Sequence, residues 1–369
     1  MTPAPMPEPT PDAARERLAA VDAAAYARTR NHLQGAVTGL SPYVTHGLLS
    51  VPECLAALDL PAQHKLVFEF GWREYWRHVW AQRGDAILQS LHEGPLAEHH
   101  YARTLPEDVR RGATGVPVID QAVRTLYASG TLHNHARMWL ASYVVHGRKV
   151  HWRAGADWLY AHLLDGDLAS NHLSWQWVAG TGSHKPYLFD AANVARFAPR
   201  EWHSWGSAVD LSYETWDALA RRPAPLPAGS GAGVDEPPLR DRPAQDPTPQ
   251  ALSGDALWLA HPWALGEPPA GAHVVGVVIT DAHASLRWSE QRWAWVMQRM
   301  SQLSERLWVG TAAELADALR GVARVRTQAN PHLSRWLPAG VEQQPEPLHF
   351  APVATRCDSF SRWWSRVNG

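Results

Sequence analysis

The stretch LLDGDLASNHLSWQW, residues 163–177, places two aspartates, an asparagine and two tryptophans close together. Asp165 and Asp167 could begin a calcium loop, but the fifth position holds alanine, the sixth is not glycine and the twelfth holds glutamine instead of glutamate. A metal site is therefore disfavoured. The two carboxylates and the amide of Asn171, beside Trp175 and Trp177, suit hydrogen bonds to a polar heterocycle with an attached ribitol or ribose.

Residues 39–50, GLSPYVTHGLLS, form the next segment with recognisable chemistry. Thr38 and Ser41 flank a turn before a helix, where free backbone N–H groups and short hydroxyls can hold a phosphate. The alternative is a simple helix start with Pro42 in the first turn, which this segment taken alone favours.

The segment EFGWREYW, residues 69–76, puts three different chemistries on one helix face. Glu69, Trp72 and Arg73 follow the spacing i, i+3, i+4, so a carboxylate, an indole and a guanidinium face the same space. The alternative is an exposed Glu69–Arg73 ion pair worth about 0.3–0.5 kcal/mol, with Trp72 covering the core.

Residues 133–138, HNHARM, repeat this arrangement more weakly. Asn134, Arg137 and Met138 lie about one helical turn apart. On its own such a segment is more typical of a polar helix face than of a site.

The charge, the cysteine content and the hydropathy of the chain exclude several classes of protein. Lys plus Arg total 34 against 36 for Asp plus Glu, so the charge of −2 leaves any DNA contact to local groups. Cys54 and Cys357 form no CxxC pair, which excludes a zinc ribbon and a disulfide framework. The chain shows neither a signal peptide nor the ~18 consecutive apolar residues of a membrane helix. We expect a cytoplasmic protein without membrane contact, and a monomer.

The residue pattern predicts a helical domain, a linker and a smaller unit. A helix capped by Asp12 should end near Gly35, and residues 36–205 alternate apolar residues at helical spacing without a convincing strand. We expect the helical domain at residues 1–222, a Pro/Gly-rich linker at 223–250 and a small α/β unit at 251–369.

The α/β unit is expected to be β-α-β-α-β, with strands near residues 274–280, 307–310 and 323–327. It contains no GxGxxG or Walker-type loop, so a nucleotide site there has no support. Its layer pattern fits a docking, antenna-like or stabilising role.

Together these segments resemble the FAD-binding helical domain of the DNA photolyase and cryptochrome family. The resemblance covers roughly residues 26–199 and rests on several motifs in one order: Tyr26-x3-Arg30, LSPYxxxGxLS (40–50), ExxWRE (69–74), TGxPxxD (114–120), HNxxRM (133–138), LxDGDLAxN (163–171) and WQW (175–177).

The resemblance implies a bent FAD held in its reduced form, FADH−, with Asn171 facing flavin N5. The residues at the matching cofactor positions are Tyr26, Thr38, Leu40, Ser41, Arg73, Asn134, Arg137, Asp165, Asp167 and Asn171.

The resemblance also implies a substrate pocket for a cyclobutane pyrimidine dimer. Its catalytic residues would be Glu69, Trp72, Met138, Asn171 and Trp177. Indole faces would sandwich a flipped-out dimer, and a protonated glutamic acid would hydrogen-bond its carbonyls. The implied enzyme is a light-dependent deoxyribodipyrimidine photolyase that transfers an electron from excited FADH− and needs no metal.

Electron transfer and DNA contacts depart from the family pattern. Trp175 and Trp152 match the first two tryptophans of a photoreduction relay, but the third is missing and Tyr101 is the nearest replacement. Arg30 and His135 are assigned to DNA. His135 replaces an arginine found in many members, so we expect binding to favour single strands of dimer-containing DNA.

Because only 25 residues precede Tyr26, we also expect the family's usual N-terminal antenna domain to be missing. No antenna chromophore is therefore expected. The alternative function is a cryptochrome-like blue-light photoreceptor that signals through its C-terminal unit. The complete dimer pocket favours repair.

Overall fold

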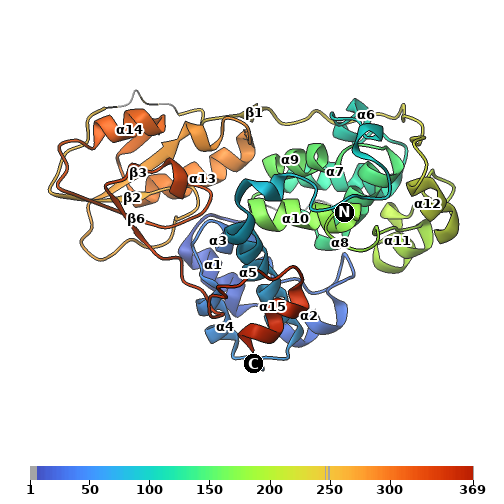
Figure 1. The fold of residues 1–369 in the computed structure, drawn as a ribbon, viewed down its shortest axis with the longest axis horizontal. Coiled ribbons are helices and arrows are strands. Elements are labelled where there is room, and N and C mark those ends of the chain that lie inside the picture. Colours follow the sequence, from blue (N-terminus) through green and yellow to red (C-terminus); the bar gives the residue numbers. More distant parts are fainter. Residues whose placement is uncertain (1–5, 246, 248–249, 369) are drawn as a thin grey trace.

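The computed structural model describes residues 6–245, 247 and 250–368. Its first part is helical and contains α1 (Pro11–Ala19), α2 (Ala23–Thr29), α3 (Ser41–Thr45), α4 (Val51–Leu58), α5 (Lys65–Arg83), α6 (Glu107–Arg110), α7 (Pro117–Ser129), α8 (Asn134–Ser142), α9 (Trp152–His162), α10 (Leu168–Ala179), α11 (Ala191–Phe197) and α12 (Tyr213–Ala220). The predicted mainly helical fold class is confirmed (Figure 1). Among the described residues, no helix has the length and apolar character to span a membrane.

The N-terminal helix differs from the prediction. A single helix from Asp12 to residue 35 is wrong, because the chain forms the two short helices α1 and α2. Thr10 caps α1 by accepting the N–H of Ala13 at 3.1 Å, and Asp22 caps α2 by accepting the N–H of Ala25 at 2.8 Å. The local cap at Asp22 starts a new helix and overrides the high helix propensity of the alanine-rich stretch.

Helix α10 lies at the centre of the helical part, packed against α5, α8 and α9. It begins after Asp167, whose carboxylate accepts the N–H of Ser170 at 2.9 Å. It ends at Gly180, where a φ of 75° favours glycine. An aspartate predicted to bind the cofactor is thus fixed at a helix start.

The α/β unit has a larger sheet than expected. Its parallel sheet has the order β5-β3-β2-β6-β7, the order of a doubly wound fold. The strands are β2 (Ala256–Ala260), β3 (Val274–Ile279), β5 (Leu307–Gly310), β6 (Arg324–Gln328) and β7 (Val341–Gln344); the helices are α13 (Glu290–Leu303) and α14 (Ala312–Ala318). The prediction of three strands missed β2, a short buried run, and β7, a mostly exposed polar strand.

The predicted linker lies against the helical part. Gly229 donates its N–H to Asp108 at 2.8 Å, and Glu236 pairs with Arg110 at 2.8 Å. Further along, β1 (Leu239–Arg240) pairs with β4 (Trp288–Ser289). The domain boundaries remain a prediction, and these contacts hold residues 229–240 of the segment in place.

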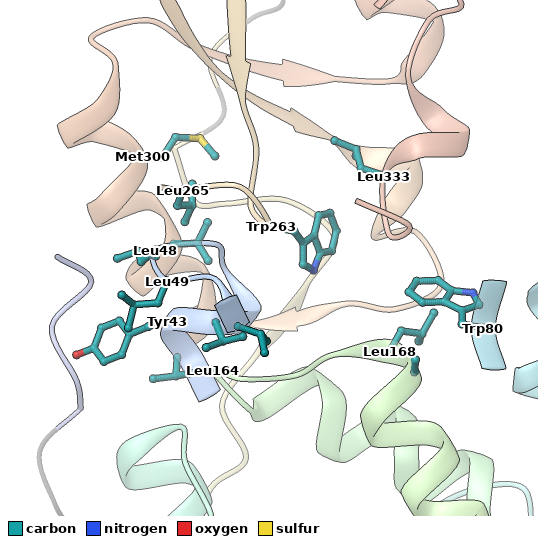
Figure 2. Close-up of a cluster of buried hydrophobic side chains, with 14 of the residues drawn as sticks. Tyr43, Leu48, Leu49, Trp80, Leu164, Leu168, Trp263, Leu265, Met300 and Leu333 are labelled. Atoms are coloured by element: carbon teal, nitrogen blue, oxygen red, sulfur yellow. The ribbon is translucent and has the colours of Figure 1, made fainter. Parts of the chain in front are cut away.

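One apolar core joins the α/β unit to the first half of the helical part. Figure 2 shows Tyr43, Leu48 and Leu49, which lie in and just after α3, near Leu265 and Met300 of the α/β unit. The chain then returns, and its last helix, α15 (Phe360–Val367), packs on α5 (Figure 1). The C-terminal part therefore contacts the elements that carry the predicted site.

Candidate functional site

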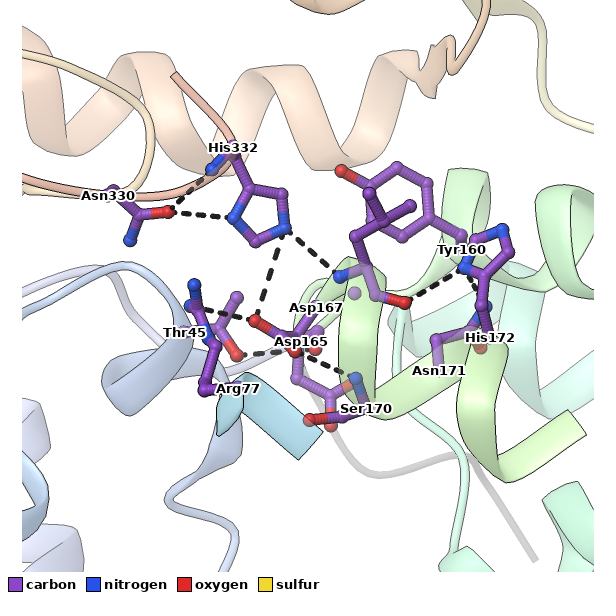
Figure 3. Close-up of polar contacts among 12 residues, drawn as sticks. Thr45, Arg77, Tyr160, Asp165, Asp167, Ser170, Asn171, His172, Asn330 and His332 are labelled. Carbon is purple, nitrogen blue, oxygen red and sulfur yellow. Dashed lines mark hydrogen bonds and ion pairs between the residues drawn. The ribbon is translucent and has the colours of Figure 1, made fainter. Parts of the chain in front are cut away.

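Asp167 is the most deeply buried acidic group of the predicted site, with its side chain 1% exposed. Its Oδ2 lies 2.8 Å from Nη2 of Arg77 (Figure 3). The same oxygen lies 3.8 Å from Nη2 of Arg73. Burial alone would raise the pKa of Asp167, but Arg77 and then Arg73 outweigh it and hold the pKa well below its usual range. The carboxylate is therefore ionised and fixed between two cations.

His332 of the α/β unit completes this group. Its Nε2 accepts the N–H of Leu168 at 3.0 Å, and its Nδ1 lies 2.7 Å from Oδ1 of Asn330 (Figure 3). Burial and then Arg77 hold the pKa of His332 well below its usual value, so the ring is neutral. Arg77, one turn after Arg73, could have been inferred from helix spacing, whereas no local signal pointed to His332.

A second acidic group gathers three predicted residues. Both carboxylate oxygens of Asp165 lie 2.9 Å from Nη2 of Arg137, and the hydroxyl of Ser41 bonds the same carboxylate. Leu40 is buried at the start of α3, and Thr38 is half-buried, its hydroxyl accepting the N–H of Leu40 at 3.4 Å. The loop before α3 and the loop before α10 are thus held together.

Glu69 forms a third group with Arg30 and Tyr26. Its Oε1 lies 2.8 Å from Nη1 of Arg30, so the alternative Glu69–Arg73 pair is wrong; Arg73 instead donates to Thr45 at 3.3 Å. Burial raises the pKa of Glu69 despite the nearby Arg30. Burial, and then Glu69, raise the pKa of Tyr26 to about 12. Arg30 is engaged inside the protein, and its role in binding DNA stays a prediction.

Trp72 has an unexpected neighbour. Its ring stacks on Phe360 of α15, with centroids 4.1 Å apart and planes 11° from parallel. The indole is half-buried, which leaves part of it accessible. A residue far away in the sequence therefore supports the indole predicted to contact the substrate.

The remaining predicted residues differ in exposure. Trp177 is 37% exposed beside Tyr187, and Asn134 is exposed with its Nδ2 3.9 Å from Sδ of Met138. Asn171 is half-buried and donates from Nδ2 to the carbonyl of Ala156 at 2.8 Å. Their exposure is compatible with a ligand, but their roles remain predictions.

His135 is poorly placed as an exposed cation. Its Nδ1 lies 2.8 Å from the carbonyl oxygen of Asn31, and its ring packs between Trp139 and Phe197. Burial lowers the pKa of His135. A neutral, half-buried imidazole would bind a phosphate more weakly than an arginine would. The contact of His135 with DNA stays a prediction.

Two of the three predicted relay residues, Trp152 and Tyr101, line one cavity. Trp175 and Trp152 are each 2% exposed. Trp152 and Tyr101 both line a cavity of about 320 Å³, and burial raises the pKa of Tyr101 to about 12. This arrangement brings the predicted tyrosine near the second tryptophan without establishing a transfer step.

A second cavity of about 310 Å³ lies where the α/β unit meets α5 and α10. Trp80 and Leu168 line it from the helical part, and Trp263, His332 and Trp336 line it from beyond the carboxyl ends of β2 and β6. Both parts of the chain thus meet beside Asp167.

Buried polar atoms without hydrogen-bond partners indicate that the helical part can accept a polar ligand. Nη2 of Arg73 and Oγ of Ser170 are buried and lack such partners. These two atoms flank the groups formed by Asp165 and Asp167. Together with the exposed amide of Asn134, this donor set fits a cofactor with phosphate and sugar oxygens.

Comparison with known proteins decides the family. Residues 66–202 match the family described as the FAD binding domain of DNA photolyase. Residues 66–202 of this chain therefore contain an FAD-binding domain of the photolyase and cryptochrome type. The family assignment supports FAD as the cofactor of this part.

Curated relatives of the photolyase and cryptochrome family cover part of the chain. A deoxyribodipyrimidine photo-lyase of Streptomyces griseus is 34% identical over 215 residues, which are 55% of this chain and 45% of that protein. The photo-lyase of Escherichia coli is 35% identical over 158 residues, 42% of this chain and 33% of that protein. A cryptochrome DASH of Gloeobacter violaceus is 31% identical over 171 residues, which are 43% of this chain and 34% of that protein. The chain spans less than half the length of each relative.

A solved structure is also similar. The Synechocystis cryptochrome is 23% identical, covers 60% of this chain and 53% of its own, and has a TM-score of 0.48.

Proposed function

We propose that the helical part binds FAD and that the protein uses light to split cyclobutane pyrimidine dimers in DNA. The carboxyl group of Glu69 carries the proposal: it is half-buried, its pKa is raised, and it lies one helical turn from Trp72 on α5. The similarity to relatives named deoxyribodipyrimidine photo-lyase supports the same reaction.

The cofactor would be held by the two aspartate groups and their surroundings. Arg73 and Arg137 provide guanidinium groups, and Asn134 and Asn171 provide amides. Tyr26, Thr38, Leu40 and Ser41 would complete the shell. Reduced FAD, when bound, supplies one electron after absorbing light.

The substrate would be held by aromatic and acidic groups. Burial raises the pKa of Glu69, so its carboxyl group takes up a proton more readily than an exposed glutamate, and the protonated acid can donate a hydrogen bond to a pyrimidine carbonyl. This bond stabilises negative charge on the dimer while its two cyclobutane bonds break. Trp72 and Trp177 provide indole faces for a flipped-out dimer, and Met138 provides a polarisable thioether.

Repair of a thymine-dimer oligonucleotide tests this proposal. The chemically reduced protein should restore intact thymines under near-UV light and not in the dark, with single and double strands assayed separately. Glu69→Gln should lower the repair rate roughly 10- to 100-fold, because a glutamine cannot release or share a proton as the acid does. FAD content should not change.

The exposed Glu305→Gln in the α/β unit serves as the charge-matched control and should repair like the wild type. Equal repair by Glu69→Gln and wild type would remove Glu69 from the reaction. Absence of light-dependent repair in the reduced, FAD-loaded wild type would overturn the proposed function.

A second candidate function is a flavin photoreceptor. The contact of His332 with Leu168 favours it, because this contact links the α/β unit to the start of α10 beside Asp167. In that case blue light should change amide hydrogen exchange in β6 and β7, and Glu69→Gln should leave the change intact. Light-independent exchange would exclude this function.

A further inference from the structure

A hydrogen-bonded path connects Trp152 with the protein surface. The indole N–H of Trp152 donates to Oγ of Ser90 at 3.0 Å, and the Ser90 hydroxyl donates to Oε1 of Glu98 at 2.6 Å. The ring of Trp152 is buried, whereas the side chain of Glu98 is 53% exposed. A hydroxyl can accept one proton while giving up another, so the path from indole to solvent is continuous.

The groups around Glu98 favour its ionised form. The hydrogen bond from Ser90, followed by those from Arg103 and His151, lowers the pKa of Glu98 to about 2. Nδ1 of His151 accepts the N–H of Arg153 at 3.2 Å, so the neutral ring carries its proton on Nε2, 3.4 Å from Oε1 of Glu98. Nε2 of His151 thus faces the carboxylate of Glu98 without forming a close hydrogen bond. The ionised carboxylate of Glu98 is the group here that can take up a proton and pass it on to water.

Trp152 lies on α9, the helix against which the other predicted relay tryptophan packs. Gly155 lies one turn after Trp152 on α9, and a Cβ atom added there would lie 2.3 Å from Cζ3 of Trp175. The indole of Trp175 thus rests directly on α9. Trp175 follows Asn171 by four residues on α10, which places both on one helix face. From Trp152 the hydrogen-bonded path continues to Ser90 and then to Glu98.

We propose that Trp152, once oxidised, releases its indole proton through Ser90 to Glu98. This inference rests on FAD binding in the proposed function. Oxidised FAD, when bound and excited by light, would take one electron from Trp175, and Trp152 would then give one electron to Trp175. The N–H bond of Trp152 then breaks: its proton moves to Ser90, and the hydroxyl proton of Ser90 moves to Glu98.

The products of this transfer are a neutral indolyl radical and a neutral carboxylic acid, so charge and atoms balance. Glu98 exchanges the proton with water, because its side chain is exposed. An electron returning to the neutral radical must be accompanied by a proton, which slows the back reaction. A thiol from solution, supplying one electron and one proton, restores Trp152. This path compensates for a relay that lacks its third tryptophan.

Transient absorption of the FAD-loaded, oxidised protein tests the path, because tryptophan radical cations and neutral radicals absorb differently. The wild type should form the neutral radical, more slowly in D₂O. In Ser90→Ala and Glu98→Gln the tryptophan radical cation should keep its proton. The lifetime of the charge-separated state should therefore fall roughly tenfold or more, as expected when a positioned base is lost. Glu93→Gln, an exposed residue on the same cavity but off the path, should match the wild type.

Unchanged deprotonation in both variants would overturn the path, and so would a wild type that forms no tryptophan radical. Circular dichroism confirms that each variant is folded, and the two positions report independently. This experiment uses oxidised flavin without DNA, whereas the repair assay uses chemically reduced flavin with DNA. Failure of dimer repair and failure of the proton path are therefore separate results.

Discussion

Asp167→Ala should lower the free energy of unfolding by about 3–5 kcal/mol, the loss expected when one partner of a buried ion pair is removed. Asp167 is 1% exposed and Arg77 is 10% exposed, so the guanidinium would remain buried without its nearest carboxylate. The other carboxylate near Arg77 is Glu346, at 4.0 Å. His332, which faces Asp167, is neutral and cannot replace the lost charge.

Urea unfolding measures this loss, and Asp190→Ala provides a matched control. Asp190 also caps a helix, accepting the N–H of Asn193 at 2.7 Å, but it has no buried arginine partner. Its replacement should cost about 0.5–2 kcal/mol, the range for losing an N-cap. If the two variants lose equal stability, capping alone explains Asp167 and the buried ion pair contributes nothing measurable.

The pH dependence of the Asp167 effect follows from its lowered pKa. Since the folded-state pKa lies below the unfolded value of about 3.9, Asp167 adds stability above that value and loses its contribution as the pH falls toward the folded pKa. The difference between wild type and Asp167→Asn should therefore be largest above about pH 4 and shrink below it. A difference that grows on acidification would contradict this assignment.

Local patterns predicted the parts of the site that lie on one element. The face of α5 with Glu69, Trp72 and Arg73, and the start of α10 at Asp167, follow from helix spacing and capping. The seven motifs also indicated the type of FAD-binding domain that residues 66–202 contain.

Partners from distant parts of the chain could not be predicted. Glu69 pairs with Arg30 instead of Arg73, because α2 packs on α5 and brings Arg30 closer. His332 reaches Leu168 only because β6 places the following loop at the interface. Periodicity reports which face of an element is apolar, and it contains no information about which element covers that face.

The partners of Glu74 also come from a distant part of the chain and could not be predicted from its motif. It belongs to the ExxWRE motif, yet its carboxylate accepts the N–H groups of His349 at 2.8 Å and Phe350 at 3.1 Å. Burial raises the pKa of Glu74 in spite of these bonds. A residue of this sequence motif thus anchors the C-terminal segment, residues 349–367, to α5.

Phe360→Ala should lower the free energy of unfolding by about 3–5 kcal/mol, as for other buried phenylalanines. Phe360 is 5% exposed, stacks on Trp72 and meets Phe68 edge-on at 4.6 Å. The neighbouring Trp364 packs so tightly on α5 that a Cβ atom at Gly71 would lie 2.3 Å from its ring. Helix α15 cannot move closer to α5 to fill the cavity left by Phe360→Ala, because Trp364 is already in tight contact with α5.

The same variant should weaken binding of dimer-containing DNA several-fold, because Trp72 loses the ring that supports it, an aromatic contact worth about 0.5–1.5 kcal/mol. Phe360→Leu separates the two effects: it keeps most of the buried volume and stability but cannot stack. Binding is measured by titration with single- and double-stranded oligonucleotides, with FAD content as the check on the helical part. If Phe360→Leu binds the dimer like the wild type, α15 contributes packing alone; if it binds as weakly as Phe360→Ala, the C-terminal helix forms part of the substrate wall through Trp72.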